Sequence, residues 1–199
     1  GEKVTEGLDG LRARLEEYRG LGARFAKWRA VITIGDGIPS VACIRANAHA
    51  LARYAALCQE AGIVPIVEPE VLMDADNTIE RCFDVTSRTL KWTFHELLVQ
   101  RVDLRGALLK PNMVISGKGC PEQASATQIA ELTLRCFLTH LPAAVPRVGV
   151  LSGDLVADVR GRLEQREVEL LVRGVERQDH ERQLAVDLAD QDCVVVGEQ

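Results

Sequence analysis

The chain has 199 residues, of which 47% are hydrophobic, and a formal net charge of −5 at pH 7. This composition is typical of one globular domain, and the acidic balance argues against nucleic acid or an anionic membrane as the main partner. No apolar run approaches the length of about 18 residues that spans a bilayer, and the N-terminus lacks the pattern of a signal peptide. We therefore expect a cytoplasmic protein.

The cysteines and histidines are scattered along the chain. The six cysteines form no C-x-x-C pair, which is typical of reduced thiols in a cytosolic protein. The HELL sequence at 95–98 lacks the second histidine of a zinc-binding helix. We expect neither a metal ion nor another cofactor.

Helical and strand patterns alternate along the chain. Helical spacing of apolar residues predicts helices at 7–22, 39–62, 76–100 and 125–141. Strands are predicted at 25–34, 63–71, 105–111 and 147–154. The strands recur about every 40 residues, each followed by a helix, which indicates βαβ units and a parallel α/β sheet with right-handed crossovers.

Polar residues lie toward the end of each predicted strand. They are Lys27 and Arg29, Glu68 and Glu70, Lys110 and Asn112, and Ser152. The spacing of two within each pair predicts that both side chains point to the same face. Substrates bind at this end of the strands both in (β/α)8 barrels and in open Rossmann-like sheets. Because TIGDGIPS at 33–40 is not the glycine-rich turn of an open sheet, we predict part of a (β/α)8 TIM barrel, with about four βα units visible.

Lys110 directly follows an apolar run, Ala107, Leu108 and Leu109, that is typical of a buried strand. Burying an ammonium group is costly, so buried lysines are rare. Burial and nearby cations lower the pKa of a lysine amine, and a neutral amine attacks carbonyl groups to form a Schiff base. The alternative is an ordinary lysine whose amine extends from the strand end into solvent.

The polar residues of the other strands favour a reactive lysine. Lys27 and Arg29 are candidate cations that would activate an amine or bind phosphate, and Glu68 would move protons as the imine forms. Ser152 and Gly153 follow a strand and offer a hydroxyl and backbone N–H groups to a phosphate. Together they predict a Schiff-base site for a phosphorylated carbonyl substrate.

Four segments carry a resemblance to a known family: FAKWRAVI, NAHALARYAALCQEAGIVPIVEPEVL, LLKPNMV and LSG. Over residues 1–153 the chain resembles the metal-independent, class I fructose-1,6-bisphosphate aldolases, in a bacterial form. The resemblance implies a (β/α)8 barrel, usually a homotetramer. It also implies reversible cleavage of fructose 1,6-bisphosphate into dihydroxyacetone phosphate and glyceraldehyde 3-phosphate, a reaction of glycolysis and gluconeogenesis.

The resemblance also implies catalytic roles for three residues. Lys110 in LLKPNM matches the Schiff-base lysine, and Lys27 in AKWR matches the active-site lysine beside it. Glu68, the first glutamate of VEPE, matches the acid and base of the reaction.

Four further residues match positions that bind the substrate or support the site. Arg29 matches a phosphate-contacting arginine, and Glu70 matches a supporting carboxylate. Ser152 and Gly153 match the loop that holds the ketose phosphate, although Asp154 follows them where the family has another glycine. The family's first strands and its SYGR-like segment have no counterpart, so we expect an N-terminally truncated, incomplete barrel.

Residues 155–199 differ in composition from the segment before them. They contain no Lys, Ser, Thr, Asn, Pro, Ile, Met or aromatic residue, and all but Cys193 are types that codons beginning with G or C can encode. This bias is expected when a GC-rich gene is read out of phase. We therefore predict a partial barrel at 1–154 and a frame-shifted tail at 155–199. The alternative is a charged helical extension with a short strand at 193–197.

Two other functions remain open from the sequence. One is a catalytically dead barrel fragment that acts only in subunit association. The other is a different Schiff-base enzyme, such as a transaldolase or a deoxyribose-phosphate aldolase, although these lack the pairing of VEPE with AKWR.

Overall fold

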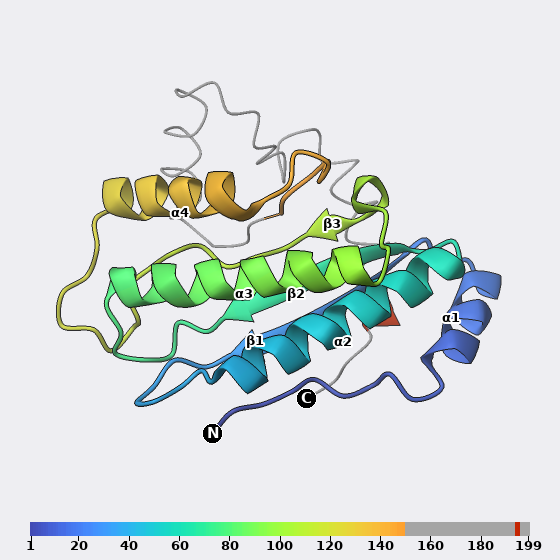
Figure 1. Cartoon of the computed structure of the whole chain (residues 1–199), viewed down its shortest axis with the longest axis horizontal. Coiled ribbons are helices and arrows are strands. Elements are labelled where there is room, and N and C mark those ends of the chain that lie inside the picture. Colours follow the sequence, from blue (N-terminus) through green and yellow to red (C-terminus); the bar gives the residue numbers. More distant parts are fainter. Residues whose placement is uncertain (150–193, 196–199) are drawn as a thin grey trace.

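A parallel β-sheet lies at the centre of the chain, with helices packed along it (Figure 1). The computed structural model describes residues 1–149 and 194–195. Within these residues the strands are β1 (Phe25–Ile32), β2 (Val64–Val71), β3 (Leu108–Leu109) and β4 (Val194–Val195), and their order in the sheet is β3-β2-β1-β4. Each of these pairings is parallel, as the alternation of strands and helices predicts.

The α-helices of the described segment are α1 (Leu11–Gly20), α2 (Val41–Glu60), α3 (Ile79–Val99) and α4 (Ala126–His140). Helix α2 packs against β1 and β2, α3 packs against β2, and α3 lies between α2 and α4 (Figure 1). Among the described residues, no helix is both long enough and apolar enough to cross a membrane.

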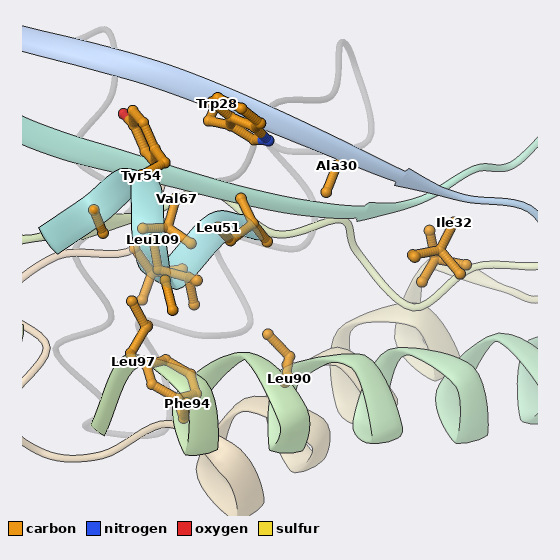
Figure 2. Close-up of a cluster of buried hydrophobic side chains, with 14 of the residues drawn as sticks. Trp28, Ala30, Ile32, Leu51, Tyr54, Val67, Leu90, Phe94, Leu97 and Leu109 are labelled. Carbon is orange, nitrogen blue, oxygen red and sulfur yellow. The ribbon is translucent and has the colours of Figure 1, made fainter. Parts of the chain in front are cut away.

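The hydrophobic core forms where the strands meet these helices (Figure 2). Buried residues of β1 alternate with half-buried ones because successive side chains of a strand point to opposite faces. Trp28 on the buried face is fully enclosed, and its ring centroid lies 5.4 Å from that of Tyr54 in α2. Helix α3 contributes Leu90, Phe94 and Leu97. Lys27 and Arg29 lie on the opposite face of β1.

Side-chain caps fix the starts of the long helices close to the predicted positions. The Ser40 hydroxyl accepts a hydrogen bond from the backbone N–H of Cys43 at 3.1 Å, which begins α2. Ser125 and Gln128 form a reciprocal capping box at the start of α4. These caps satisfy N–H groups that have no partner within the helix.

Two elements are much shorter than predicted. Helix α1 begins at Leu11 rather than at residue 7, because Gly10 adopts a left-handed conformation (φ 65°) directly before it. Strand β3 contains only Leu108–Leu109 of the predicted 105–111 segment. Residues Leu104–Gly106 form a 3-10 helix, and Pro111 has no N–H to continue the ladder.

The fourth predicted strand, 147–154, is described only in its first residues. Val148 forms a parallel bridge with Leu109, and the N–H of Gly149 donates to the carbonyl of Leu109 at 2.8 Å. The chain therefore returns beside β3 in the parallel sense that a fourth βα unit requires. Residues 150–154, and with them Ser152, Gly153 and the predicted boundary after residue 154, lie outside the described residues.

The tail is described only at β4, which pairs with Ala26 and Lys27 of β1. This strand falls inside the 193–197 segment for which a short strand is the alternative expectation. The remaining tail residues, on which the frame-shift prediction depends, lie outside the described part of the chain.

The loop after β3 docks on the loop after β2 through backbone hydrogen bonds. The N–H groups of Gly117 and Gly119 donate to the carbonyls of Asn77 and Ala75, at 2.8 and 2.9 Å. A Cβ added at Gly117 would overlap the carbonyl oxygen of Ala75 and lie 2.9 Å from Oδ1 of Asn77. The backbone at this point therefore has no room for a side chain.

We predict that Gly117→Ala lowers the free energy of unfolding by ~2 kcal/mol, because the two loops must separate to admit the methyl group. The matched control is Gly20→Ala, where an added Cβ meets nothing within 4 Å. Urea denaturation followed by circular dichroism measures both. Equal effects of the two substitutions would contradict the close approach at Gly117.

Cys58 of α2 is fully enclosed, and burial raises the pKa of its thiol from 9.0 to about 12. Above about pH 9 the unfolded chain loses this proton while the folded chain keeps it, so the stability contributed by the thiol falls as pH rises. We predict a decline in unfolding free energy of up to about 1.4 kcal/mol per pH unit from this group. Denaturation of the wild type and Cys58→Ala across this range measures it, and parallel declines in the two proteins would contradict it.

Candidate active site

The carboxylate of Glu68 in β2 lies between Lys27 of β1 and Lys110, which directly follows β3. Glu68 is 3% exposed, and its Oε1 accepts a hydrogen bond from Nζ of Lys110. Its Oε2 lies 3.3 Å from Nζ of Lys27, within ion-pair distance, but accepts no hydrogen bond. The side chains of Lys110 and Lys27 are 23% and 28% exposed, so neither is fully buried.

The backbone register brings these three side chains together. In the β1–β2 pairing, Lys27 lies opposite Ile66 and Arg29 lies opposite Glu68. The N–H of Lys110 donates to the carbonyl of Val67 at 2.8 Å, and this bond places Lys110 beside Glu68 of β2. A parallel ladder with this register therefore determines the site.

Arg29 and Glu70 form a second ion pair on the same face of the sheet. Nε of Arg29 donates a hydrogen bond to Oε2 of Glu70, and this bond raises the pKa of the Arg29 guanidinium. The side chains are 38% and 23% exposed, so solvent reaches the pair. The hydroxyl of Thr5 donates to the backbone carbonyl of Arg29 at 2.8 Å, so the N-terminal segment passes along β1 here.

The prediction that the first polar pair ends its strand is wrong. Lys27 and Arg29 lie within β1, which continues to Ile32. They still share one face, as their spacing predicts, because Ala26, Trp28 and Ala30 occupy the other. The site consequently lies over the body of the sheet.

The prediction that Lys110 and Asn112 point to the same face is also wrong. Lys110 contacts Glu68, whereas the amide of Asn112 contacts Thr86 of α3 on the helix-covered side. The spacing rule fails because β3 ends at Leu109, so residues 110–112 no longer alternate as a strand. Sequence reasoning thus missed the contacts of Asn112. The available signal was the residue type, because asparagine side chains often form hydrogen bonds with backbone groups.

Two of the predicted site residues, Ser152 and Gly153, lie outside the described residues, so the structure neither joins them to this cluster nor separates them from it. Within the described part of the chain, no group of three or more His, Cys, Asp or Glu side chains is placed to hold a metal ion. The described cluster consists of Lys27, Arg29, Glu68, Glu70 and Lys110.

This arrangement suits proton transfer to and from a lysine amine. A carboxylate in contact with one lysine and close to a second can take a proton from an ammonium group and return it elsewhere. Because Glu68 is shielded from water, its interactions with both cations are stronger than the same contacts at the surface. Fold and site together define a parallel α/β segment with a lysine–carboxylate centre on one face of its sheet.

Comparison with known proteins identifies the family. Residues 1–160 match the model of the glycolytic fructose-bisphosphate aldolase class-I family. A probable class 1 fructose-bisphosphate aldolase from Xanthomonas campestris is 65% identical over 153 residues, which cover 77% of this chain and 46% of the relative. A fructose-bisphosphate aldolase from Dictyostelium discoideum is 50% identical over 155 residues, covering 77% of this chain and 43% of the relative.

A solved structure agrees with these sequence relatives. Fructose-bisphosphate aldolase from Plasmodium falciparum superposes with a TM-score of 0.76 at 44% identity, covering 81% of this chain and 48% of that one. The chain belongs to the class I fructose-bisphosphate aldolase family, and its parallel α/β arrangement is part of the family's TIM barrel. It spans about half the length of the curated relatives it matches.

We predict that Glu68→Gln destabilises the fold by ~3 kcal/mol, because two lysines would then face each other across a buried neutral amide. Glu70→Gln is the control, since its carboxylate is more exposed and pairs with one arginine. Urea denaturation at neutral pH compares the variants. A Glu68→Gln protein as stable as the wild type would show that the lysines do not need the carboxylate.

Proposed function

We propose that this chain carries the imine-forming site of a class I fructose-bisphosphate aldolase, with Lys110 as the nucleophile. The substrate would be fructose 1,6-bisphosphate, cleaved reversibly into dihydroxyacetone phosphate and glyceraldehyde 3-phosphate. The observation that carries this proposal is the buried carboxylate of Glu68 in contact with Lys110 and 3.3 Å from Lys27. Membership of the aldolase family supports it.

The proposed reaction begins when Lys110 gives up a proton to Glu68. The neutral amine attacks the ketone carbon of the sugar, and a C–N bond forms as the carbonyl oxygen becomes a hydroxyl. Glu68, now protonated, donates to that hydroxyl, which leaves as water and gives an iminium ion. Lys27 provides positive charge beside the carboxylate throughout this step.

Carbon–carbon cleavage then uses the iminium nitrogen as the electron sink. A base removes the proton of the hydroxyl on the second carbon from the iminium carbon. That oxygen forms the aldehyde carbonyl as the bond between this carbon and the carbon next to the iminium breaks. The electron pair of that bond moves into an enamine on Lys110. Protonation of the enamine carbon and hydrolysis of the imine release dihydroxyacetone phosphate and restore the amine. We assign the proton transfers to Glu68 because it is the carboxylate in contact with Lys110.

Arg29, Glu70, Ser152 and Gly153 are assigned to substrate binding. Arg29 is a cation on the same face as Lys110, and its pairing with Glu70 holds the guanidinium in place until a phosphate competes for it. Ser152 and Gly153 are assigned to the ketose phosphate on the match of their LSG motif. We further propose a cytoplasmic location and a homo-oligomer, with no nucleic-acid or membrane partner, which agrees with a relative named as a cytoplasmic isozyme from Pisum sativum.

The division of the chain at residue 154 also stays a proposal, with residues 155–199 as a frame-shifted tail. It is supported by a relative aligned over 153 residues of the chain, whereas the family match runs on to residue 160. The coding DNA tests it, because another reading phase after codon 154 would extend the βα pattern. If neither alternative phase does so, the tail is a genuine extension.

The imine is the direct test of the proposed function. We predict that dihydroxyacetone phosphate followed by borohydride adds one reduced adduct to Lys110, detected by peptide mass spectrometry. Lys118, with a side chain that is 65% exposed, is the internal control and stays unmodified. Lys110→Met abolishes the adduct.

An adduct on Lys110 with no cleavage of fructose 1,6-bisphosphate would show that this chain retains imine chemistry without turnover. Absence of any adduct in the folded chain would favour the catalytically dead fragment. Equal labelling of Lys110 and Lys118 would indicate only general amine reactivity and would contradict the proposal.

A further inference from the structure

We propose that Asn112 is a positioning residue that holds Lys110 against Glu68, an inference that rests on the proposed function. In the part of the chain that the structure describes, Asn112 forms no hydrogen bond with Glu68 or with the amine of Lys110. It acts through the backbone two residues after the lysine, in the stretch where β3 has ended.

Two hydrogen bonds attach β2 to the segment that carries Lys110. The N–H of Lys110 donates to the carbonyl of Val67 at 2.8 Å, and Oδ1 of Asn112 accepts from the N–H of Val71 at 3.0 Å. Glu68 and Glu70 lie between these two points. Pro111 cannot donate a hydrogen bond, so the Asn112 side chain supplies the next contact along β2.

The side chain of Asn112 also links this segment to helix α3. Its Nδ2 donates to Oγ1 of Thr86 at 3.0 Å and to the backbone carbonyl of Met113 at 2.9 Å. Thr86 is 1% exposed on α3, which packs against β2. One side chain therefore joins the end of β2, the lysine segment and α3.

The two ends of the Asn112 amide match the donors and acceptors around them. The partner of Oδ1 is an N–H donor and one partner of Nδ2 is a carbonyl acceptor, so the orientation of the amide is fixed by its partners. Aspartate would keep the acceptor for Val71 but direct a lone pair at the Met113 carbonyl. Leucine would leave all three contacts unmade. Only an amide of this length satisfies the three partners together.

The consequence for Lys110 follows from how sensitive catalysis is to placement. A shift of about 1 Å in a reacting group is able to lower a rate on the order of a hundredfold. Because the segment 110–112 is held by single hydrogen bonds rather than by a continuous ladder, loss of the Asn112 contacts moves the lysine backbone away from β2. The amine then spends less time beside Glu68, which accepts its proton.

The test measures the Lys110 amine in ways that do not require turnover. Trace acetic anhydride labels each lysine of the full chain in proportion to the reactivity of its amine, and Lys91, exposed on α3, is the internal reference. Labelling is followed against pH in the wild type, Asn112→Ala and Asn112→Asp. Hydrogen exchange at the Val71 amide reports the proposed contact itself.

A matched pair of substitutions at Thr86 covers the case in which the Asn112 variants fail to fold. Thr86→Val removes the hydroxyl at nearly constant volume, and Thr86→Ser retains it. We expect Thr86→Val to change the labelling profile of Lys110 in the same direction as Asn112→Ala, and Thr86→Ser to restore it. A merely structural defect would change Lys91 as well.

We expect Asn112→Ala to speed exchange at Val71 and to slow borohydride trapping at Lys110 on the order of tenfold or more, with its pH profile displaced. The inference is overturned if Lys110 keeps its wild-type profile relative to Lys91 in both Asn112→Ala and Thr86→Val. If dihydroxyacetone phosphate gives no adduct even in the wild type, the proposed function fails. Labelling and exchange then decide the positioning role separately.

Discussion

The site depends on one buried charge, the carboxylate of Glu68, and on the two lysines that make its burial tolerable. An isolated carboxylate at 3% exposure would be strongly disfavoured, and a single partner would leave one oxygen uncompensated. Lys110 and Lys27 approach different oxygens of the same group. Lys27 lies in β1 and Lys110 directly follows β3, the strands on either side of β2, so the ion cluster exists only when the three strands are correctly paired. The local structure of each strand and the chemistry of the site are therefore determined by the same pairing.

Much of this arrangement could be predicted from the sequence. The alternation of apolar and charged residues in FAKWRAVI places Trp28 in the core and Lys27 with Arg29 on the other face, and the structure has this pattern. Ser40 and Ser125 mark the starts of two helices through hydrogen bonds that depend only on neighbouring residues. Such local rules are reliable because their energies need no knowledge of the rest of the fold.

The features that could not be predicted depend on contacts between distant segments. Pro111 in RGALLKP indicates that the ladder is interrupted, but the exact end of the strand after Leu109 depends on where Val67 offers its carbonyl and where Val148 returns. The prediction for the face of Asn112 is wrong for the same reason, since two of its partners, Val71 and Thr86, are 41 and 26 residues away in sequence. The alternation of side chains between two faces applies only within a strand, and Asn112 lies beyond the end of β3.

The net charge of the ion-paired site cluster differs in sign from the net charge of the chain. Lys27, Arg29 and Lys110 face Glu68 and Glu70, so the ion-paired cluster carries one more positive than negative group, whereas the chain has a formal net charge of −5. Each carboxylate holds a cation in place. The ion pairs fix the amines and the guanidinium on the face that the proposed substrate would approach. The proposed substrate, a phosphorylated sugar, is an anion, and a cluster that is locally positive on an acidic chain would attract it to this face. The arrangement that makes Glu68 tolerable in the fold is thus also the one that would bring the substrate's carbonyl to Lys110.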